Sequence, residues 1–299
     1  MDWRVWVIMG LIAFGIWRKT PFYAALGYKE EDMKVFISAD IEGITTTTVW
    51  DECDSSHPSY HLHGVQMTDE VLACIEGAKN AGATEIVVRD AHADATNIDP
   101  TRMPSGVSLI RNWSGHPYAM AEGVDSSFDA AMFIGYHSAA GRTGNPMSHT
   151  ISGRRFQRIL INGNIASEFM LYSWACAFEG VPTVFLSGDR ALCEDACDLH
   201  PRLIACPVKD GVGSATVNYS VVDTLASIAA LSQKALSQNL RGALAALPSR
   251  FEVEVEYKSH IFAEKAMWFP GVTRKGDNTV VFGSDSFFEV LRTISWISG

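Results

Sequence analysis

Acidic and imidazole side chains follow three apolar segments of the sequence. Asp40 and Glu42 come directly after the first segment, His92 after the second and His137 after the third. Carboxylates and neutral imidazoles are the side chains that bind zinc and similar divalent cations. Each residue alone fits a structural role, such as a solvated strand end or a hydrogen-bonded histidine. Three strand ends that each supply a ligand type together predict a metal site.

Glu168 adds a third carboxylate to this set. It falls in the first turn of a predicted helix, where a negative charge also suits the helix dipole. Two imidazoles and three carboxylates exceed the four ligands of one tetrahedral zinc ion. The set suits two divalent ions about 3.5–4 Å apart that share a carboxylate and a water. Asp40 and Glu42 lie on one side of an extended chain, and Asp40 is the natural bridge.

The elements that must position these residues alternate between strands and helices. Apolar runs predict strands over Lys34–Ala39, Glu85–Arg89, Val107–Arg111, Ala130–Tyr136, Phe156–Ile161, Thr183–Ser187, Leu203–Val208 and Phe251–Tyr257. Helical spacing predicts helices over Thr68–Asn80, Ile165–Glu179, Arg190–Leu199 and Val221–Leu240. This order predicts an α/β fold with a mixed, largely parallel sheet flanked by helices. The carboxyl ends of neighbouring parallel strands then meet in one crevice.

Local signals refine this arrangement. Thr68 is a plausible N-cap for its helix, and Asn162-Gly163 is a plausible hairpin turn. The strict alternation of Phe251–Tyr257 predicts a strand with one solvated face. We expect residues 33–190 to form the metal-binding catalytic domain. Residues 191–299 are expected to form a smaller C-terminal α/β lobe of the same enzyme body.

The overall composition is that of a globular protein that does not bind nucleic acid. The 299 residues include 47% apolar and 19% charged residues, which excludes disorder and coiled coil. The formal net charge is −10, and no long basic run is present to neutralise phosphates. The six cysteines form no CxxC pair, so we expect reduced thiols and a reducing compartment, which favours the cytoplasm.

An apolar segment near the N-terminus leaves the location open. Val5–Trp17 is uninterrupted by polar residues and is flanked by Arg4 and by Arg18-Lys19. Thirteen helical residues rise only about 20 Å, short of the roughly 30 Å hydrocarbon core. Residues 1–32 are therefore a weak membrane anchor, an uncleaved export signal, or an extension upstream of a true start at Met33. Membrane contact through residues 5–17 and export are the alternatives to the cytoplasm.

The motifs that contain these residues carry a resemblance to a known family. The chain resembles the zinc-dependent D-aminopeptidases, M55-type metallopeptidases, through five features in the same order: Ser38–Gly43, Asp90–His92, Gly135–His137, Met147–His149 and Glu168. The resemblance implies a dinuclear zinc aminopeptidase that removes D-residues such as D-alanine from the N-terminus of short peptides or amides. It also implies a homo-oligomer, a ring-like decamer around an inner chamber. Mn²⁺ or Co²⁺ are expected to substitute for zinc.

The resemblance also implies a role for each site residue. Asp40 would bridge both ions, Glu42 and His137 would complete one, and His92 and Glu168 the other. His149 matches the family's catalytic histidine. A metal-activated water is itself a strong nucleophile. We therefore expect His149 to assist that water by stabilising developing charge and delivering a proton to the leaving amine.

Two other functions remain open at this point. A dinuclear phosphoesterase would use a similar ligand set, and although no phosphate-binding glycine loop or arginine cluster is evident, Arg89 keeps it in view. A non-catalytic peptide-binding component of a transport system would use the N-terminal segment for export. The histidines of the loop after Glu42 are expected at the surface: His57, His61 and His63. Four further residues are candidates for a substrate pocket: Asp94, Arg111, Trp113 and His116.

Overall fold

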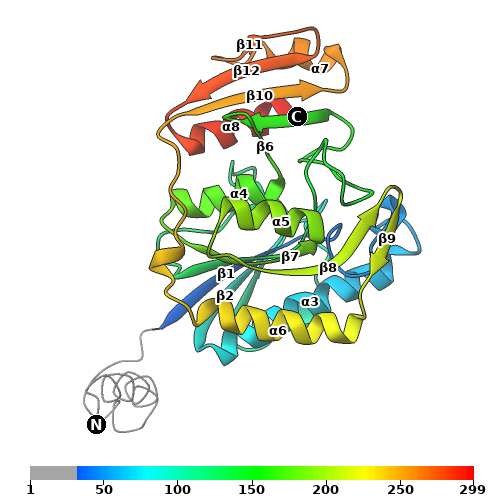
Figure 1. Ribbon diagram of the computed structural model, residues 1–299, viewed down its shortest axis with the longest axis vertical. Helices are drawn as coiled ribbons and strands as arrows, with labels where there is room; N and C mark the ends of the chain where they lie inside the picture. The colour runs from blue at the N-terminus through cyan, green and yellow to red at the C-terminus, as the bar shows by residue number, and fades with distance from the viewer. Residues whose placement is uncertain (1–31) are drawn as a thin grey trace, which may run out of the picture. The chain divides into compact units, whose positions relative to one another are not determined.

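The computed structural model describes residues 32–299, and within this range a seven-stranded sheet forms the centre of the fold (Figure 1). Its strand order is β3-β2-β1-β4-β7-β8-β9. The strands are β1 (Met33–Ala39), β2 (Ala83–Asp90), β3 (Val107–Ile110), β4 (Ala130–Tyr136), β7 (Thr183–Asp189), β8 (Ile204–Val212) and β9 (Ala215–Asn218). The pairs β2–β3, β1–β4, β4–β7 and β7–β8 are parallel, and β8–β9 is antiparallel. The predicted α/β fold with a largely parallel sheet is confirmed.

Helices cover both faces of this sheet (Figure 1). One face carries α3 (Tyr60–Asn80) and α6 (Val221–Leu236), and the other carries α4 (Glu168–Phe178) and α5 (Arg190–Leu199). The first two helices pack closely at Gly77, where an added Cβ would lie 2.0 Å from Ser232 Oγ. Only glycine allows this approach. The sheet is thus buried on both faces, which explains the continuous apolar runs of its central strands.

A second sheet of five strands, with antiparallel pairings throughout, lies beyond α4 (Figure 1). Its order is β11-β12-β10-β5-β6. The strands are β5 (Phe156–Ile161), β6 (Asn164–Ile165), β10 (Phe251–Tyr257), β11 (Thr273–Arg274) and β12 (Thr279–Ser284), and the helices α7 (His260–Ala266) and α8 (Phe287–Ser298) accompany them. Trp174 of α4 packs against Phe251 and Phe287, so one continuous core joins this sheet to the helical layer.

Most of the predicted elements are present, with shifted ends. The α3 helix begins at Tyr60, and Thr68 lies inside it, where its hydroxyl donates to the Gly64 carbonyl. The prediction of Thr68 as N-cap was therefore wrong, because the eight residues before it, Tyr60 to Met67, also adopt helix. The predicted hairpin at Asn162-Gly163 is confirmed, and both residues have positive φ. The half-solvated strand β10 is confirmed as well.

Sheet membership does not follow the predicted boundary after residue 190. Strand β8 comes after that boundary but belongs to the large sheet, whereas β5 comes before it and pairs with β10 in the second sheet. Residues 34–299 form one compact unit. The division into residues 33–190 and 191–299 stays a prediction. Short 3₁₀ helices complete the fold: η1 (Trp50–Glu52), η2 (Pro100–Arg102), η3 (Ala119–Ala121) and η4 (Arg241–Ala243).

The predictions for the N-terminal segment fall on residues that the structure does not describe. Residues 1–31 lie outside the described range, and Val5–Trp17 is among them. The strand expected to begin near Met33 does begin there. Among residues 32–299, no helix has the length and apolar character needed to cross a bilayer.

Candidate metal centre

The carboxyl ends of three neighbouring strands meet where the predicted ligands lie. The parallel register of β1 and β4 pairs Ala39 with Ile134, and the Asp40 N–H donates to the Ile134 carbonyl at 2.9 Å. On the other side of β1, the Ala91 N–H donates to the Ala39 carbonyl at 2.9 Å. These backbone contacts place His92 and Asp40 at one edge of the sheet.

A close backbone contact at Gly43 holds the loop after β1 against the end of β4. The Gly43 N–H donates to the Gly135 carbonyl at 2.7 Å. A Cβ at Gly43 would lie 1.8 Å from the Tyr136 carbonyl oxygen, so a side chain has no room there. The glycine therefore lets the loop that carries Glu42 pass directly beside the segment that ends in His137.

The five predicted metal ligands come together in two groups that share Asp40. In one group, His92 Nδ1 lies 3.3 Å from Asp40 Oδ1 and 3.0 Å from Glu42 Oε2. In the other, His137 Nε2 lies 3.5 Å from Asp40 Oδ2 and 3.3 Å from Glu168 Oε2. All five side chains are buried, and each group could hold a divalent ion.

His149 lies beside these groups, in contact with the second. Its ring stacks on that of His137, with centroids 4.3 Å apart, and its Nε2 lies 3.6 Å from Glu168 Oε1. His149 is also close enough to Glu42 and His137 for the three to form a further potential ligand set. The half-exposed Trp50 covers the ring of His149 edge-on at 5.2 Å. The predicted catalytic histidine is thus at the centre rather than remote from it.

Helix α4 begins at the centre and fixes Glu168 there. Ser167 caps the helix by accepting a hydrogen bond from the Met170 N–H at 3.0 Å. Glu168 is the first helical residue, and its Oε1 accepts the Ile151 N–H at 2.6 Å. One oxygen therefore holds the segment that follows His149, while the other faces His137.

Hydrogen bonds to the backbone determine which nitrogen of each ring carries a proton. A carbonyl oxygen only accepts, so the ring nitrogen beside it must donate, and in a neutral imidazole the other nitrogen then has a lone pair. The contacts are His92 Nε2 to the Cys53 carbonyl at 2.9 Å, His137 Nδ1 to the Ser138 carbonyl at 3.0 Å and His149 Nδ1 to the Met147 carbonyl at 2.9 Å. The three lone pairs consequently face the carboxylates of the centre.

A metal ion fits this donor set because several buried atoms lack hydrogen bonds. Among the described residues, Asp40 Oδ2, Glu42 Oε2 and His137 Nε2 are buried without a hydrogen-bond partner of regular geometry. Carboxylate oxygens and imidazole lone pairs so close together repel one another unless a cation or proton lies between them. Buried carboxylates and imidazoles of this kind are suited to zinc.

The pKa values show the same competition between protons and cations. Burial, followed by the negative charge of Glu42, raises the pKa of Asp40 well above its usual range. Burial alone would lower the pKa of His137, but the charge and hydrogen bond of Glu168, together with the charges of Asp40 and Glu42, outweigh it and raise that pKa to about 10. Protons thus occupy the same lone pairs that a metal ion would use, so acid should weaken metal binding.

His149 behaves differently from the other two histidines. Burial lowers its pKa, and the neighbouring charge of His137 lowers it further. A neutral imidazole with its Nε2 lone pair directed into the centre can accept a proton and return it. The geometry therefore suits a proton-transfer role for His149.

The buried charged residues Glu70, Asp189 and Lys209 near the centre were not predicted from the sequence. Glu70 accepts the Thr45 N–H at 2.8 Å, and Asp189 accepts the Ser138 N–H at 2.7 Å. No local sequence signal distinguishes them from solvated charges. Only the packing of distant elements shows that they support the loops of the centre.

The histidines after Glu42 have separate environments. His57 and His61 are exposed, as expected for surface residues. His63 is buried, which corrects the expectation of a surface position: its Nδ1 lies 2.8 Å from Thr47 Oγ1 and its Nε2 3.5 Å from Glu52 Oε1. Because it lies on the inward side of α3, His63 supports the loop after β1.

Of the four residues suggested for a substrate pocket, Trp113 has the clearest relation to the centre. Its Nε1 donates to the Ala93 carbonyl at 2.7 Å, next to His92. Its ring covers the buried guanidinium of Arg89 at 4.1 Å. For Asp94, Arg111 and His116, no contact with the ligand set is present, and their place in a pocket stays a prediction.

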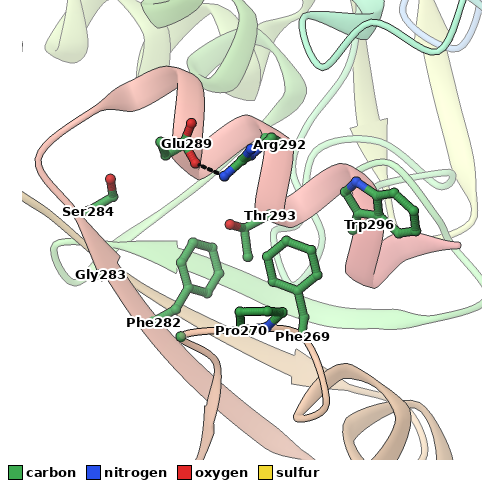
Figure 2. Close-up of a pocket in the computed structure, with 10 residues that line it drawn as sticks. Phe269, Pro270, Phe282, Gly283, Ser284, Glu289, Arg292, Thr293 and Trp296 are labelled. Atoms are coloured by element: carbon green, nitrogen blue, oxygen red, sulfur yellow. Dashed lines mark hydrogen bonds and ion pairs between the residues drawn. The ribbon is translucent and has the colours of Figure 1, made fainter.

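A surface pocket of about 460 Å³ lies elsewhere, between α8 and the second sheet (Figure 2). Figure 2 shows Phe269, Phe282 and Trp296 around it, with the ion pair of Glu289 and Arg292 at its rim. None of the candidate metal ligands lines this pocket. Pocket and metal centre are therefore separate features.

The comparisons with known proteins agree with one another. The family model for peptidase family M55, D-aminopeptidase, matches residues 33–296. A curated D-aminopeptidase of Bacillus subtilis (strain 168) is 30% identical over 270 residues, which are 88% of this chain and 95% of that protein. The solved structure of a Zn-dependent D-aminopeptidase, DppA from Bacillus subtilis, described as a self-compartmentalizing protease, has a TM-score of 0.83. It is 27% identical, and the match covers 89% of this chain and 97% of that one.

Proposed function

Since the chain belongs to the D-aminopeptidase family M55 and is a metal-dependent peptide hydrolase, we propose that it is a dinuclear zinc aminopeptidase. It removes the N-terminal residue of short peptides or amides and prefers D-residues such as D-alanine. The family resemblance supports this substrate class. The observation that carries the metal proposal is the pair of buried ligand groups that share Asp40.

The distances favour a division of ligands that differs from the one implied by the resemblance. Glu42 lies with His92, and Glu168 lies with His137. One ion would therefore be held by Asp40, Glu42 and His92, and the other by Asp40, His137 and Glu168. These distances, which motif spacing does not reveal, distinguish the two divisions.

Zinc bound at these residues supplies a Lewis acid for the peptide carbonyl and lowers the pKa of a water molecule. The chain itself supplies the proton transfer. His149, neutral and directed into the centre, takes a proton during attack and delivers it to the leaving amine. The Met147 carbonyl fixes the orientation of its ring, and Trp50 shields one edge from solvent.

The two rival functions lack comparable support. Arg89, which kept a phosphoesterase in view, is fully buried beneath Trp113, and its Nη1 donates to the Asn112 carbonyl. It is not presented to a substrate phosphate. A transport-system component that binds peptide without turnover would not need two buried metal-ligand groups that share Asp40.

The proposal extends to the assembly and the location of the protein. A homo-oligomer, and specifically a decamer, is supported by the family resemblance and by the description of the DppA neighbour as self-compartmentalizing. We propose a cytoplasmic location, which the six unpaired cysteines support. Membrane association or export through residues 5–17 is the alternative.

One experiment tests the proposal directly. Matched D- and L-alanine amides and a phosphodiester are offered to the purified protein with added zinc and with a chelator, and the bound metal is counted. We expect about two zinc ions per chain, hydrolysis of the D-amide, and its loss with chelator. Hydrolysis of the L-amide alone would overturn the substrate class. Phosphodiester hydrolysis alone, or metal-free protein with full activity, would overturn the function.

A further inference from the structure

Lys209 is a fully buried lysine that lies behind the metal centre on strand β8. Its Nζ donates to the Glu42 carbonyl at 2.6 Å and to the Thr47 carbonyl at 2.5 Å. These two carbonyls both belong to the loop between β1 and η1. A single ammonium group therefore ties together two points of the loop that carries the metal ligands Asp40 and Glu42.

Neighbouring contacts show that this loop is held from several sides. Asn145 Nδ2 also donates to the Glu42 carbonyl, at 3.0 Å, and Asn145 Oδ1 accepts the Met147 N–H at 2.9 Å. Since Met147 holds the His149 ring, Asn145 connects the loop to the catalytic histidine. Lys209 is the positively charged member of this network, and Asp189, which accepts from Asn145 Nδ2 at 3.3 Å, is a negatively charged one.

Burial of an unpaired lysine ammonium group costs free energy of folding, so the contacts of Lys209 must offset that cost. The carboxylates of Asp189 and Glu70 lie close enough to offset its charge in part. Hydrogen bonds from an ammonium group are stronger than neutral ones and hold a backbone carbonyl more firmly. The two carbonyls that it holds belong to the metal loop, not to the regular sheet.

We propose that Lys209 is a positioning residue of the metal centre, which fixes the loop from Glu42 to Thr47 so that the Glu42 carboxylate faces His92. This inference rests on the proposed dinuclear function, because it assigns Lys209 to the same site. Lys209 does not touch the ion or the substrate. It acts through the backbone of a ligand residue, as supporting residues around metal sites commonly do.

The test replaces Lys209 by methionine, which keeps most of the side-chain volume and removes the donor. Lys79→Met is the matched control, because Lys79 Nζ also donates to a backbone carbonyl, that of Ser105, but on the surface. Zinc affinity is measured by competition with a chromophoric chelator on folded protein. We expect about 10- to 100-fold weaker binding for Lys209→Met and unchanged binding for Lys79→Met.

Further readouts separate positioning from a purely structural role. In the zinc-loaded enzyme, Lys209→Met should lower kcat with little change in KM, and the absorption spectrum of the Co²⁺-substituted protein should shift. Lys209→Arg, which keeps a positively charged donor, should recover part of the zinc affinity. If Lys209→Met does not fold, Lys209→Gln is measured by the same criteria.

The outcomes distinguish this inference from the proposed function. A variant with lower thermal stability but wild-type zinc affinity, cobalt spectrum and kcat would overturn the positioning role and leave the proposed function standing. A wild-type protein that binds no zinc would overturn the proposed function itself. Weaker zinc binding in Lys209→Met, with Lys79→Met unchanged, supports both.

Discussion

Carboxylates are buried at the metal-binding edge of the large sheet but exposed or half-exposed on the second sheet. At the edge, Asp40, Glu42 and Glu168 are buried beside one another. On β10 of the second sheet, the carboxylates reach solvent and pair with surface cations, as Glu254 does with Lys275. Exposed pairs of this kind contribute little to stability. Buried like charges without cations are unfavourable, so the edge is organised for binding rather than for folding.

Removal of a buried carboxylate should have the largest effect on zinc content and on kcat/KM. Asp40→Asn keeps the shape but weakens both ligand groups, so we expect loss of bound zinc and a decrease in kcat/KM of at least about 10³-fold. Glu254→Gln on the second sheet should change kcat/KM less than about twofold, since its pair is exposed. Metal analysis and steady-state kinetics on both variants provide the measurement. Equal effects of the two substitutions would contradict the contrast between the regions.

A second substitution separates catalysis from metal binding within the edge. His149→Ala should lower kcat by about 10²- to 10⁴-fold while zinc content stays at the wild-type level. The exposed His260, at the start of helix α7 beside the second sheet, provides the control, because His260→Ala should leave both quantities unchanged. If His149→Ala loses zinc in proportion to activity, His149 is a metal ligand and the proposed proton transfer is wrong.

The two regions also differ in what the sequence could predict. At the edge, residue type and position after an apolar strand were enough to identify Asp40, His92 and His137 as one cluster, because parallel strands converge. The division of ligands between ions was not accessible in this way, since it depends on side-chain distances that residue spacing does not reveal. Lys209 was also inaccessible, because 167 residues separate it from the carbonyl of Glu42.

In the second sheet, local sequence patterns predict the burial of individual residues. The alternation of β10 predicted its half-solvated face, and this is confirmed. No element was predicted after Tyr257, although the buried positions of α8 recur with helical spacing: Phe287, Val290, Leu291, Ile294 and Ile297. The pairing of β5 with β10 joins segments about a hundred residues apart. It explains why the boundary at residue 190 does not match the sheets.

His200 is buried away from the metal-binding edge and has no carboxylate neighbour within the described part of the chain. His200, at the end of α5, packs against Phe169, and its Nε2 lies 3.0 Å from Ser173 Oγ. Its Nδ1 is buried without a hydrogen-bond partner among the described residues. Burial, with no carboxylate to oppose it, lowers the pKa of His200 to about 4. Burial lowers the pKa of both histidines, but only His137 has carboxylate neighbours that raise its pKa again.

This lowered pKa predicts a smaller effect, on stability alone. The unfolded chain binds a proton at His200 near pH 6.5, and the folded chain does so only near pH 4, so stability is present above pH 6.5 and is lost as pH falls towards 4. Between pH 7 and pH 5, zinc-free wild-type protein should lose about 2 kcal/mol more free energy of unfolding than His200→Leu. Urea unfolding with chelator present measures this difference and removes the metal from the comparison. If the free energies of unfolding of the wild-type protein and of His200→Leu change equally with pH, then burial does not lower the pKa of His200 in the folded protein.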